Sequence, residues 1–410
     1  MTDGFAGSRP NPVDSSYAWL RLGVALVLGT IGSVGMWSYV VALPSVQADF
    51  GASRADASLP YTLAMVGFAV GNGFLGRLAD RYGIIAPILV SIASLGVGYV
   101  AAGLAPSLWL LSAAHMILGF GSAASFGPLI ADLSHWFEKR RGIAIGIAAS
   151  GTYLAGAIWP PIIQHFIASD GWRATHIGIG IFCVLTMLPL SLMFRRRSEI
   201  HHNSDAQRGG FAPPDIGVSS NTLFVLLCIA GVACCVAMAM PQVHIVAYCG
   251  DLGYGVARGA EMLSLMLAFG LISRIGSGLI ADRFGGVVTL LIGSVMQAAA
   301  LALYFVFDGL TSLYIISILF GLFQGGIVPS YAVIIREYFP PQEAGSRLGF
   351  VIMATVFGMA FGGWMSGWIF DLTGSYRAAF LNGLAWNLLN LAIALWLLGA
   401  GRSGRRAATA

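Results

Sequence analysis

Long apolar runs separated by short polar segments make up most of the chain. Twelve runs have about 20 residues, the length at which a helix crosses a bilayer. They lie at 20–44, 57–76, 84–105, 107–131, 142–166, 175–194, 222–247, 258–281, 287–307, 310–335, 346–370 and 376–400. The longest polar stretch, RRRSEIHHNSDAQRGGFAPPDIG at 195–217, falls near the midpoint. The pattern predicts an all-α membrane protein with 12 transmembrane helices in two six-helix bundles.

The same pattern divides the chain into four segments. We predict an N-terminal bundle over 1–194, a linker over 195–221, a C-terminal bundle over 222–400 and a tail over 401–410. Composition agrees, because 57% of the residues are hydrophobic and 10% are charged, whereas a soluble domain carries about 25% charged residues. The net charge of +4 is spread over loops and predicts no nucleic-acid partner. The cysteines lack disulfide or metal spacing, and we expect no metal or cofactor.

The distribution of basic residues predicts the orientation in the membrane. Of the 22 Lys and Arg residues, Arg54, Arg173, Arg258 and Arg377 fall on one side and Arg274 falls within the eighth apolar run. The other 17 share a side with both termini. Because Lys and Arg are retained in cytoplasmic loops, both termini are predicted to be cytoplasmic. Arg274 is left as the one basic residue that topology does not explain.

The two halves of the sequence repeat each other. GRLADRYG at 76–83 matches GLIADRFG at 278–285 with an offset of 202 positions, and GWRAT at 171–175 resembles SYRAA at 375–379. Similar segments half a chain apart and in the same orientation are typical of two bundles related by an axis along the membrane normal. In such proteins the binding site lies near the bilayer midplane between the halves.

These segments carry a resemblance to a known family. The repeated G-x-L-A-D-R-x-G segment and the 12 apolar runs resemble the major facilitator superfamily over essentially the whole chain. DSSYAW at 14–19 and WFEKRR at 136–141 resemble two signatures of its monocarboxylate transporter family, which is related to oxalate/formate antiporters. The resemblance implies a non-enzymatic secondary transporter of a small monocarboxylate. It also implies alternating access and symport with a proton, in a bacterial cytoplasmic (inner) membrane.

The resemblance further implies a latch that closes the cytoplasmic ends in one state of the cycle. Asp80 would contact the start of the eleventh helix near Arg347, and Asp132 through Arg77 or Arg81. The candidate latch residues are Asp80, Arg81, Asp132, Asp282 and Arg283. As an alternative, each of these charges serves only to set topology in a solvated turn.

Arg274 is the strongest candidate for binding a ligand. It lies eight residues before Asp282, roughly 12 Å inside the helix end, where an arginine costs about 2.5–3.5 kcal/mol on insertion scales. Gly270, Ser277 and Gly278 share its helical face and are expected to leave space around the guanidinium. The planar guanidinium suits a carboxylate held by two hydrogen bonds. The alternative is a structural arginine satisfied by carbonyls and polar side chains.

Two departures from the related transporters limit the prediction. Animal members carry an acidic residue where this chain has Gly270 and a lysine on the first helix, where this chain has none, so the proton-carrying group is open. Oxalate/formate exchangers carry a lysine that aligns with Thr355. With one cation inside the membrane, a monoanion is the expected ligand.

Five other side chains are candidates to line the same site: Tyr39, His115, Gln324, Tyr331 and Phe357. Tyr39, Gln324, Tyr331 and Phe357 lie on helices that line the cavity in this superfamily, and aromatic walls with one arginine would suit a small acid with an apolar tail. His115 could carry a proton or form a hydrogen bond with a substrate hydroxyl. Each could instead pack between helices. Competing functions are an anion exchanger, an organic-acid exporter and a membrane sensor that binds a carboxylate without transporting it.

Overall fold

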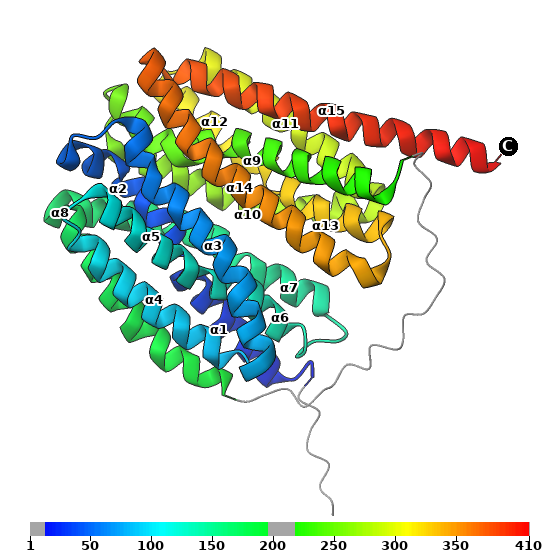
Figure 1. The fold of residues 1–410 in the computed structure, drawn as a ribbon, viewed down its shortest axis with the longest axis horizontal. Helices are drawn as coiled ribbons and strands as arrows, with labels where there is room; N and C mark the ends of the chain where they lie inside the picture. Colours follow the sequence, from blue (N-terminus) through cyan, green and yellow to red (C-terminus); the bar gives the residue numbers. More distant parts are fainter. Residues whose placement is uncertain (1–12, 196–217, 410) are drawn as a thin grey trace, which may run out of the picture.

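The computed structural model describes residues 13–195 and 218–409, and the regular elements in these ranges are helices (Figure 1). The first half contains α1 (Ser16–Gly32), α2 (Val34–Phe50), α3 (Arg54–Tyr82), α4 (Ile85–Gly103), α5 (Leu108–Ser122), α6 (Gly127–Leu133), α7 (Arg141–Ala149) and α8 (Gly151–Ser191). The second half contains α9 (Ser220–Asp251), α10 (Val256–Phe284), α11 (Gly286–Val306), α12 (Leu310–Gln324), α13 (Ile327–Tyr338), α14 (Pro341–Thr373) and α15 (Tyr376–Thr409). The prediction of an all-α protein is confirmed.

The helices are long and apolar enough for a membrane. Within the described residues, 11 helical spans meet that criterion, so the chain is an integral multi-pass membrane protein. One span, Gly142–Phe194, has 53 residues. At 1.5 Å per residue a straight helix of this length would far exceed the ~30 Å hydrocarbon core. Gly171 breaks it, with φ 79° and ψ 163°, between the fifth and sixth predicted runs.

Some predicted runs are interrupted helices. The first run forms α1 and α2, which meet at Ser33. The fourth is broken between α5 and α6 at Phe126, and the tenth between α12 and α13 at Gly325 and Gly326. Most of the predicted linker, 196–217, lies outside the described residues. The helix of the last run continues beyond the predicted start of the tail and ends at Thr409.

The sequence repeat is also a repeat of backbone conformation. Helices α3 and α10 both have 29 residues. They end at Gly83 (φ 83°, ψ 170°) and Gly285 (φ 83°, ψ 169°), a region of backbone space that glycine enters without strain. The amide of Gly83 donates to Ala79 O at 2.8 Å, and that of Gly285 donates to Ala281 O at 2.9 Å. The repeated segments are therefore two copies of one helix end.

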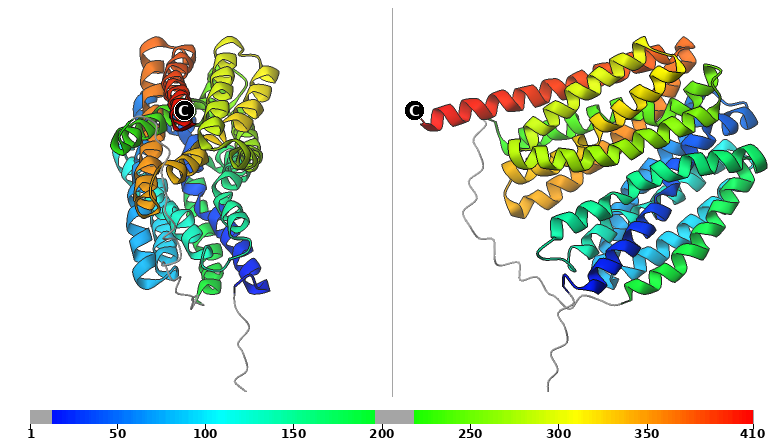
Figure 2. Two further views of the ribbon diagram at one scale, coloured as in Figure 1. Left: turned by 90° about the vertical axis from the view of Figure 1, so that its right-hand side faces the viewer. Right: turned by 180° about the vertical axis from the view of Figure 1, so that it is seen from behind.

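The helices gather into two groups, α1–α8 and α9–α15 (Figures 1 and 2). The groups pack through α3 against α14 and through α8 against α10. Glycines on α14 permit the close approach, because a Cβ at Gly367 would lie 2.8 Å from Arg54 O. We call the end with the α2–α3 turn the Arg54 end, and the end with the α3–α4 turn the Asp80 end. The two groups adjoin at the Arg54 end and lie further apart toward the Asp80 end (Figure 1).

The two segments that carry the transporter resemblance contact each other at the Asp80 end. The Asp14 amide donates to Trp136 O at 3.0 Å, and Asp14 Oδ2 accepts from the Lys139 amide at 3.0 Å. Their aromatic residues also pack, with Trp19 and Phe137 ring centroids 5.1 Å apart. DSSYAW and WFEKRR thus pack against each other, and this contact ties the start of α1 to the loop before α7.

Candidate binding cavity between the two halves

A cavity of about 150 Å³ lies between the two groups of helices. Its wall is formed by residues of α2, α3 and α8 from the first half and of α9, α10, α13 and α14 from the second. Phe126, at the break between α5 and α6, also lines it. Arg274 of α10 lies in this wall, and it is the charged residue among the described lining residues.

The cavity wall follows the sequence repeat. Three pairs of lining residues are separated by the offset of 202 that relates GRLADRYG to GLIADRFG: Met36 and Met238, Met65 and Leu267, and Phe126 and Val328. The cavity therefore lies where the two repeats face each other, as in transporters built from repeated bundles. The charge breaks this symmetry. The position that corresponds to Arg274 is Asn72, whose side-chain amide donates to Phe68 O at 2.9 Å and does not line the cavity.

Arg274 has few protein partners. Its guanidinium lies over the Tyr153 ring at 4.5 Å, and Nη1 donates to Ala149 O at 3.2 Å. Nε is buried without a hydrogen-bond partner among the described residues, and no acidic side chain in that part of the chain pairs with Arg274. A cation–π contact and one carbonyl leave most of the guanidinium donors unused. The cavity thus contains a positive charge that can accept an anion.

The small residues beside Arg274 have a different role from the one expected. A Cβ at Gly270 would lie 2.5 Å from the Tyr153 ring, so this glycine admits Tyr153 beneath the guanidinium. Ser277 packs against Gly326 at the α12–α13 break, and only Gly278 borders open space. The expectation of free space at Gly270 and Ser277 was wrong, because helical spacing fixes a face but not what packs on it. The room for a ligand lies on the cavity side instead.

Thr355, the position where related exchangers carry a lysine, lies in the same wall as Arg274. Its hydroxyl donates to Ile352 O at 2.7 Å, within its own helix. The described wall therefore offers a single positive charge. This agrees with the monoanion expected from the sequence.

Two of the other candidates, Tyr39 and His115, are buried inside the first half. Their rings pack edge to face at 4.6 Å, and neither lines the cavity. The Tyr39 hydroxyl donates to Ala57 O, and His115 Nδ1 bonds to Leu111 O at 2.9 Å. In this conformation both side chains are parts of the bundle core.

The remaining candidates lie in the second half. Gln324 is buried and accepts a hydrogen bond of 2.7 Å from Gln242, which lines the cavity, so Gln324 reaches the site only through Gln242. Tyr331 is buried and donates to Asn390 at 3.1 Å. The Phe357 side chain is 59% exposed, on the outer side of α14. Its ring stacks on that of Phe361, with 6.1 Å between the ring centroids. None of these three lines the cavity in this conformation.

Several lining residues were not predicted from the sequence. Trp37 donates its indole N–H to Thr152 O at 3.1 Å, which joins α2 to α8 across the cavity wall. Tyr153 supports Arg274, as described above. The repeat offset was an available signal for some of them, since Met238 is the counterpart of Met36.

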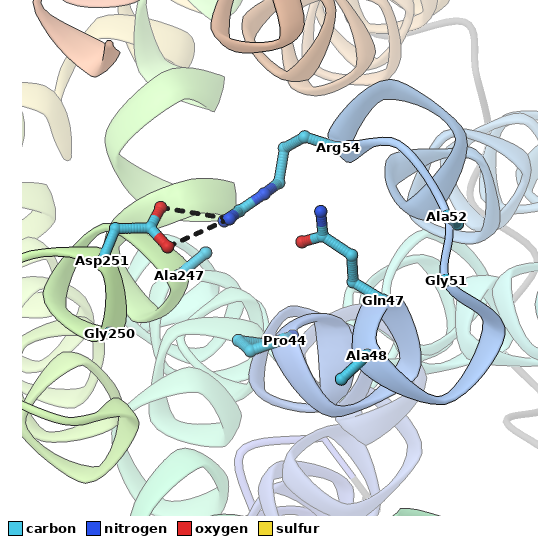
Figure 3. Close-up of a pocket in the computed structure, with 9 residues that line it drawn as sticks. All are labelled: Pro44, Gln47, Ala48, Gly51, Ala52, Arg54, Ala247, Gly250 and Asp251. Atoms are coloured by element: carbon cyan, nitrogen blue, oxygen red, sulfur yellow. Dashed lines mark hydrogen bonds and ion pairs between the residues drawn. The ribbon is translucent and has the colours of Figure 1, made fainter. Parts of the chain in front are cut away.

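A network at the Arg54 end joins the two halves. Arg54 is 6% exposed, and it pairs with Asp251 of α9 at 3.0 Å and donates to the Tyr376 hydroxyl at 2.9 Å. Asp371 of α14 accepts from the amides of Arg54 (2.8 Å) and Ala55 (2.7 Å), at the positive N-terminus of α3. A second pocket of about 450 Å³ lies beside the Arg54–Asp251 pair (Figure 3). The distribution of basic residues had predicted only a topological role for Arg54.

The predicted latch residues do not bridge the halves in this conformation. Asp80, Arg81, Asp282 and Arg283 are all exposed at the Asp80 end. Arg81 lies over the ring of Tyr82 at 5.3 Å, and Arg283 lies over the ring of Phe284 at 5.6 Å, each on its own helix. No ion pair of Asp80 or Asp282 occurs within residues 13–195 and 218–409. Arg347, the expected partner of Asp80, pairs with Glu343 at 2.8 Å.

The prediction that Asp132 pairs with Arg77 or Arg81 was wrong. Asp132 pairs with Arg21 of α1 at 2.8 Å, not with Arg77 or Arg81. Arg21 is 1% exposed and lies between the rings of Trp136 and Phe194, 4.5 Å from each centroid. The pair joins α1, α6 and the end of the sixth run within one half. The hydropathy pattern missed it because Arg21 lies near a run end and was counted with the topology-setting charges.

Two repeated groups of membrane helices around a central cavity are the architecture typical of membrane transporters. Residues 25–311 and 262–410 match the family model of the Major Facilitator Superfamily, and the chain belongs to this superfamily. Its members are transporters and not enzymes, which confirms the sequence-based assignment.

The chain is also similar to individual transporters. The chain is 25% identical over 388 residues to monocarboxylate transporter 13 of Rattus norvegicus, with 91% of this chain and 87% of that protein covered. It is 27% identical over 187 residues to a probable sulfoacetate transporter, SauU, of Cupriavidus necator, with 45% and 44% covered. Its fold resembles a mutant of the nucleoside transporter NupG, with a TM-score of 0.74, 13% identity, and 93% of this chain and 99% of that chain covered.

Proposed function

We propose that the chain is a secondary transporter of a small monocarboxylate, coupled to a proton and operating by alternating access. The observation that carries the proposal is Arg274, a cation in the wall of the central cavity that no acidic residue of the described chain neutralises. A carboxylate would supply the missing negative charge and accept two parallel N–H···O bonds. The relationship to monocarboxylate transporters supports the same class of ligand.

The proposal includes an arrangement in the membrane. The 12 helices of the sequence-based prediction follow if the chain turns at Gly171. We place both termini and the Asp80 end in the cytoplasm, with segments 1–194 and 222–400 as the moving bundles and 195–221 as their linker. A bacterial inner membrane is part of the proposal and is supported by the bacterial relative SauU.

In this orientation the structure corresponds to an inward-facing state. The Arg54 network closes the outer end, and the latch charges at the cytoplasmic end are apart. We propose that Asp80, Arg81, Asp282 and Arg283 pair across the halves in the opposite, outward-facing state. Breaking one set of contacts while the other forms is the general basis of a two-state cycle.

Proteoliposomes containing the full chain test the proposal. Uptake of radiolabelled lactate or benzoate is measured with an inward proton gradient, with no gradient, and with the gradient removed by a protonophore. Uptake that requires the gradient supports symport. Uptake that needs an internal carboxylate instead supports an anion exchanger, and outward movement alone supports an exporter. Binding of carboxylates without any movement would support a sensor and contradict transport.

A further inference from the structure

The central cavity is lined mainly by sulfur-containing and aromatic side chains. Met36 and Met65 enter from the first half, and Met238 and Met359 enter from the second. Phe68 and Phe126 add aromatic surface to the same wall. Methionine adapts its shape to a bound group and makes favourable sulfur–aromatic contacts. A wall of this composition suits a flat, apolar group that contacts both halves.

The polar groups of the wall are largely engaged by the protein. Trp37 donates to Thr152 O, Thr355 donates to Ile352 O, and the Gln242 amide donates to Gln324. Tyr61 and Tyr153 also line the wall, and their hydroxyls are donors that a ligand could use. Besides Arg274 and these two hydroxyls, the wall therefore has little capacity for ligand oxygens. Buried polar groups without partners reduce affinity, which disfavours ligands that carry several hydroxyl or keto groups.

The cavity has room for an aromatic ring. Its volume is about 150 Å³, and a dry apolar cavity of about 150 Å³ is large enough to bind benzene. Lactate or pyruvate would satisfy Arg274 but leave much of the apolar wall without contacts. Because atoms that face a void lose their dispersion contacts, a ligand that fills the space is bound more tightly.

We propose that the preferred substrate is an aromatic monocarboxylate, with its carboxylate on Arg274 and its ring between the methionines of the two halves. This inference rests on the proposed transport function and specifies its substrate class. Phenylacetate is the model ligand: it has one negative charge, one ring and no further polar group. Ring contacts with both halves would also favour closure of the cavity around the substrate.

Ligand-dependent thermal stability of the purified full chain in lipid nanodiscs tests the inference, since a ligand of the folded state raises the melting temperature according to its affinity. The probes are phenylacetate, lactate and benzyl alcohol, which lacks the carboxylate. We expect phenylacetate to bind at least tenfold more tightly than lactate, and benzyl alcohol to have no effect at the same concentrations.

Two variants of one side chain provide the matched control. Met359→Gln keeps the size of the side chain and makes it polar, whereas Met359→Leu keeps it apolar. Met359 is only partly buried, so both variants are expected to fold. The preference for phenylacetate over lactate should fall at least threefold in Met359→Gln and by a smaller factor in Met359→Leu, which keeps an apolar contact with the ring. An unchanged preference in Met359→Gln would overturn the proposed position of the ring.

The outcomes separate this inference from the function on which it rests. Lactate binding as tight as phenylacetate binding, with uptake of lactate into proteoliposomes, would overturn the aromatic preference and leave monocarboxylate transport intact. If neither acid bound nor was transported, both the substrate class and the proposed function would be contradicted.

Discussion

Two arginines mark the interface between the halves, and their surroundings are opposite. Arg54 is enclosed by partners from the other half: Asp251, the Tyr376 hydroxyl and the Phe370 ring at 4.7 Å. Arg274 has a single carbonyl and a ring, and no carboxylate within the described residues. The difference indicates that a satisfied arginine holds the halves together, whereas an unsatisfied one is available to a ligand.

The physical basis of the difference is the cost of an unpaired buried charge. A guanidinium inside a membrane protein is tolerated when acidic groups or water-filled space compensate it. Arg54 receives compensation from the protein itself, and loss of Asp251 would leave this buried guanidinium without its ion-pair partner. Arg274 borders a cavity, and an anionic substrate would complete its coordination. Variants at Arg54 and at Arg274 can therefore separate the contact that holds the halves together from the binding of a ligand in the cavity.

The largest effect is expected for Arg274→Gln, which removes the cavity charge. A charge-assisted hydrogen bond contributes about 1.5–3 kcal/mol, so monocarboxylate uptake should fall roughly 10- to 100-fold. Uptake into proteoliposomes measures it, and the quantity of folded protein by size-exclusion chromatography is the control. Uptake above a third of the wild-type rate would show that Arg274 does not hold the substrate.

Arg54→Gln should act on conformation and not on the cavity. Loss of the pair with Asp251 should open the Arg54 end, so the distance between spin labels at Ala48→Cys and Ala257→Cys should increase. Both positions are exposed, one in each half. Arg258→Gln is the matched control, because Arg258 is exposed at the same end and pairs with Glu261 on its own helix. Equal distance distributions in the two variants would show that Arg54 does not hold the Arg54 end closed.

A several-fold effect is expected for Gly270→Ala. The new methyl group would meet the Tyr153 ring and displace the support beneath Arg274, so the affinity for a carboxylate should fall by a factor of about 3–10. Gly278→Ala lies on the same helix and meets no atom within 4 Å, so it should bind like the wild type. Isothermal titration measures both, and a matching affinity in the two variants would exclude the role of Tyr153.

The smallest effect on transport is expected for Asp132→Asn. Because Arg21 and Asp132 join helices of one half, the variant should lower the melting temperature by several degrees while uptake per folded molecule changes less than twofold. Differential scanning fluorimetry and uptake measure the two effects. An unchanged melting temperature with abolished uptake would restore the gating role that the sequence predicted for Asp132.

Much of the fold could be predicted because a bilayer imposes a strong rule on sequence. Apolar runs gave the spans to within a few residues, and the repeat GRLADRYG and GLIADRFG located two equivalent helix ends at Gly83 and Gly285. Arg274 was found for the same reason, since a charge inside an apolar run is costly and calls for a function.

The rest depended on contacts that a one-dimensional pattern does not contain. Asp371 is 317 positions from Arg54, and no spacing rule links them. Tyr39 and His115 lie on plausible faces, but a helix in a bundle has several buried faces and only one borders the cavity. The role of Gly270 required the position of Tyr153, which comes from another helix.

Binding of lactate and benzoate to Arg274→Lys tests the central claim most directly, because lysine keeps the charge but lacks the planar pair of donors. Isothermal titration with the wild-type chain and the variant in nanodiscs gives the two affinities. We expect the variant to bind the acid that the wild type binds, but with an affinity lower by a factor of about ten or more. This factor corresponds to the loss of roughly one charge-assisted hydrogen bond. Wild-type affinity in Arg274→Lys would contradict a carboxylate held by this arginine.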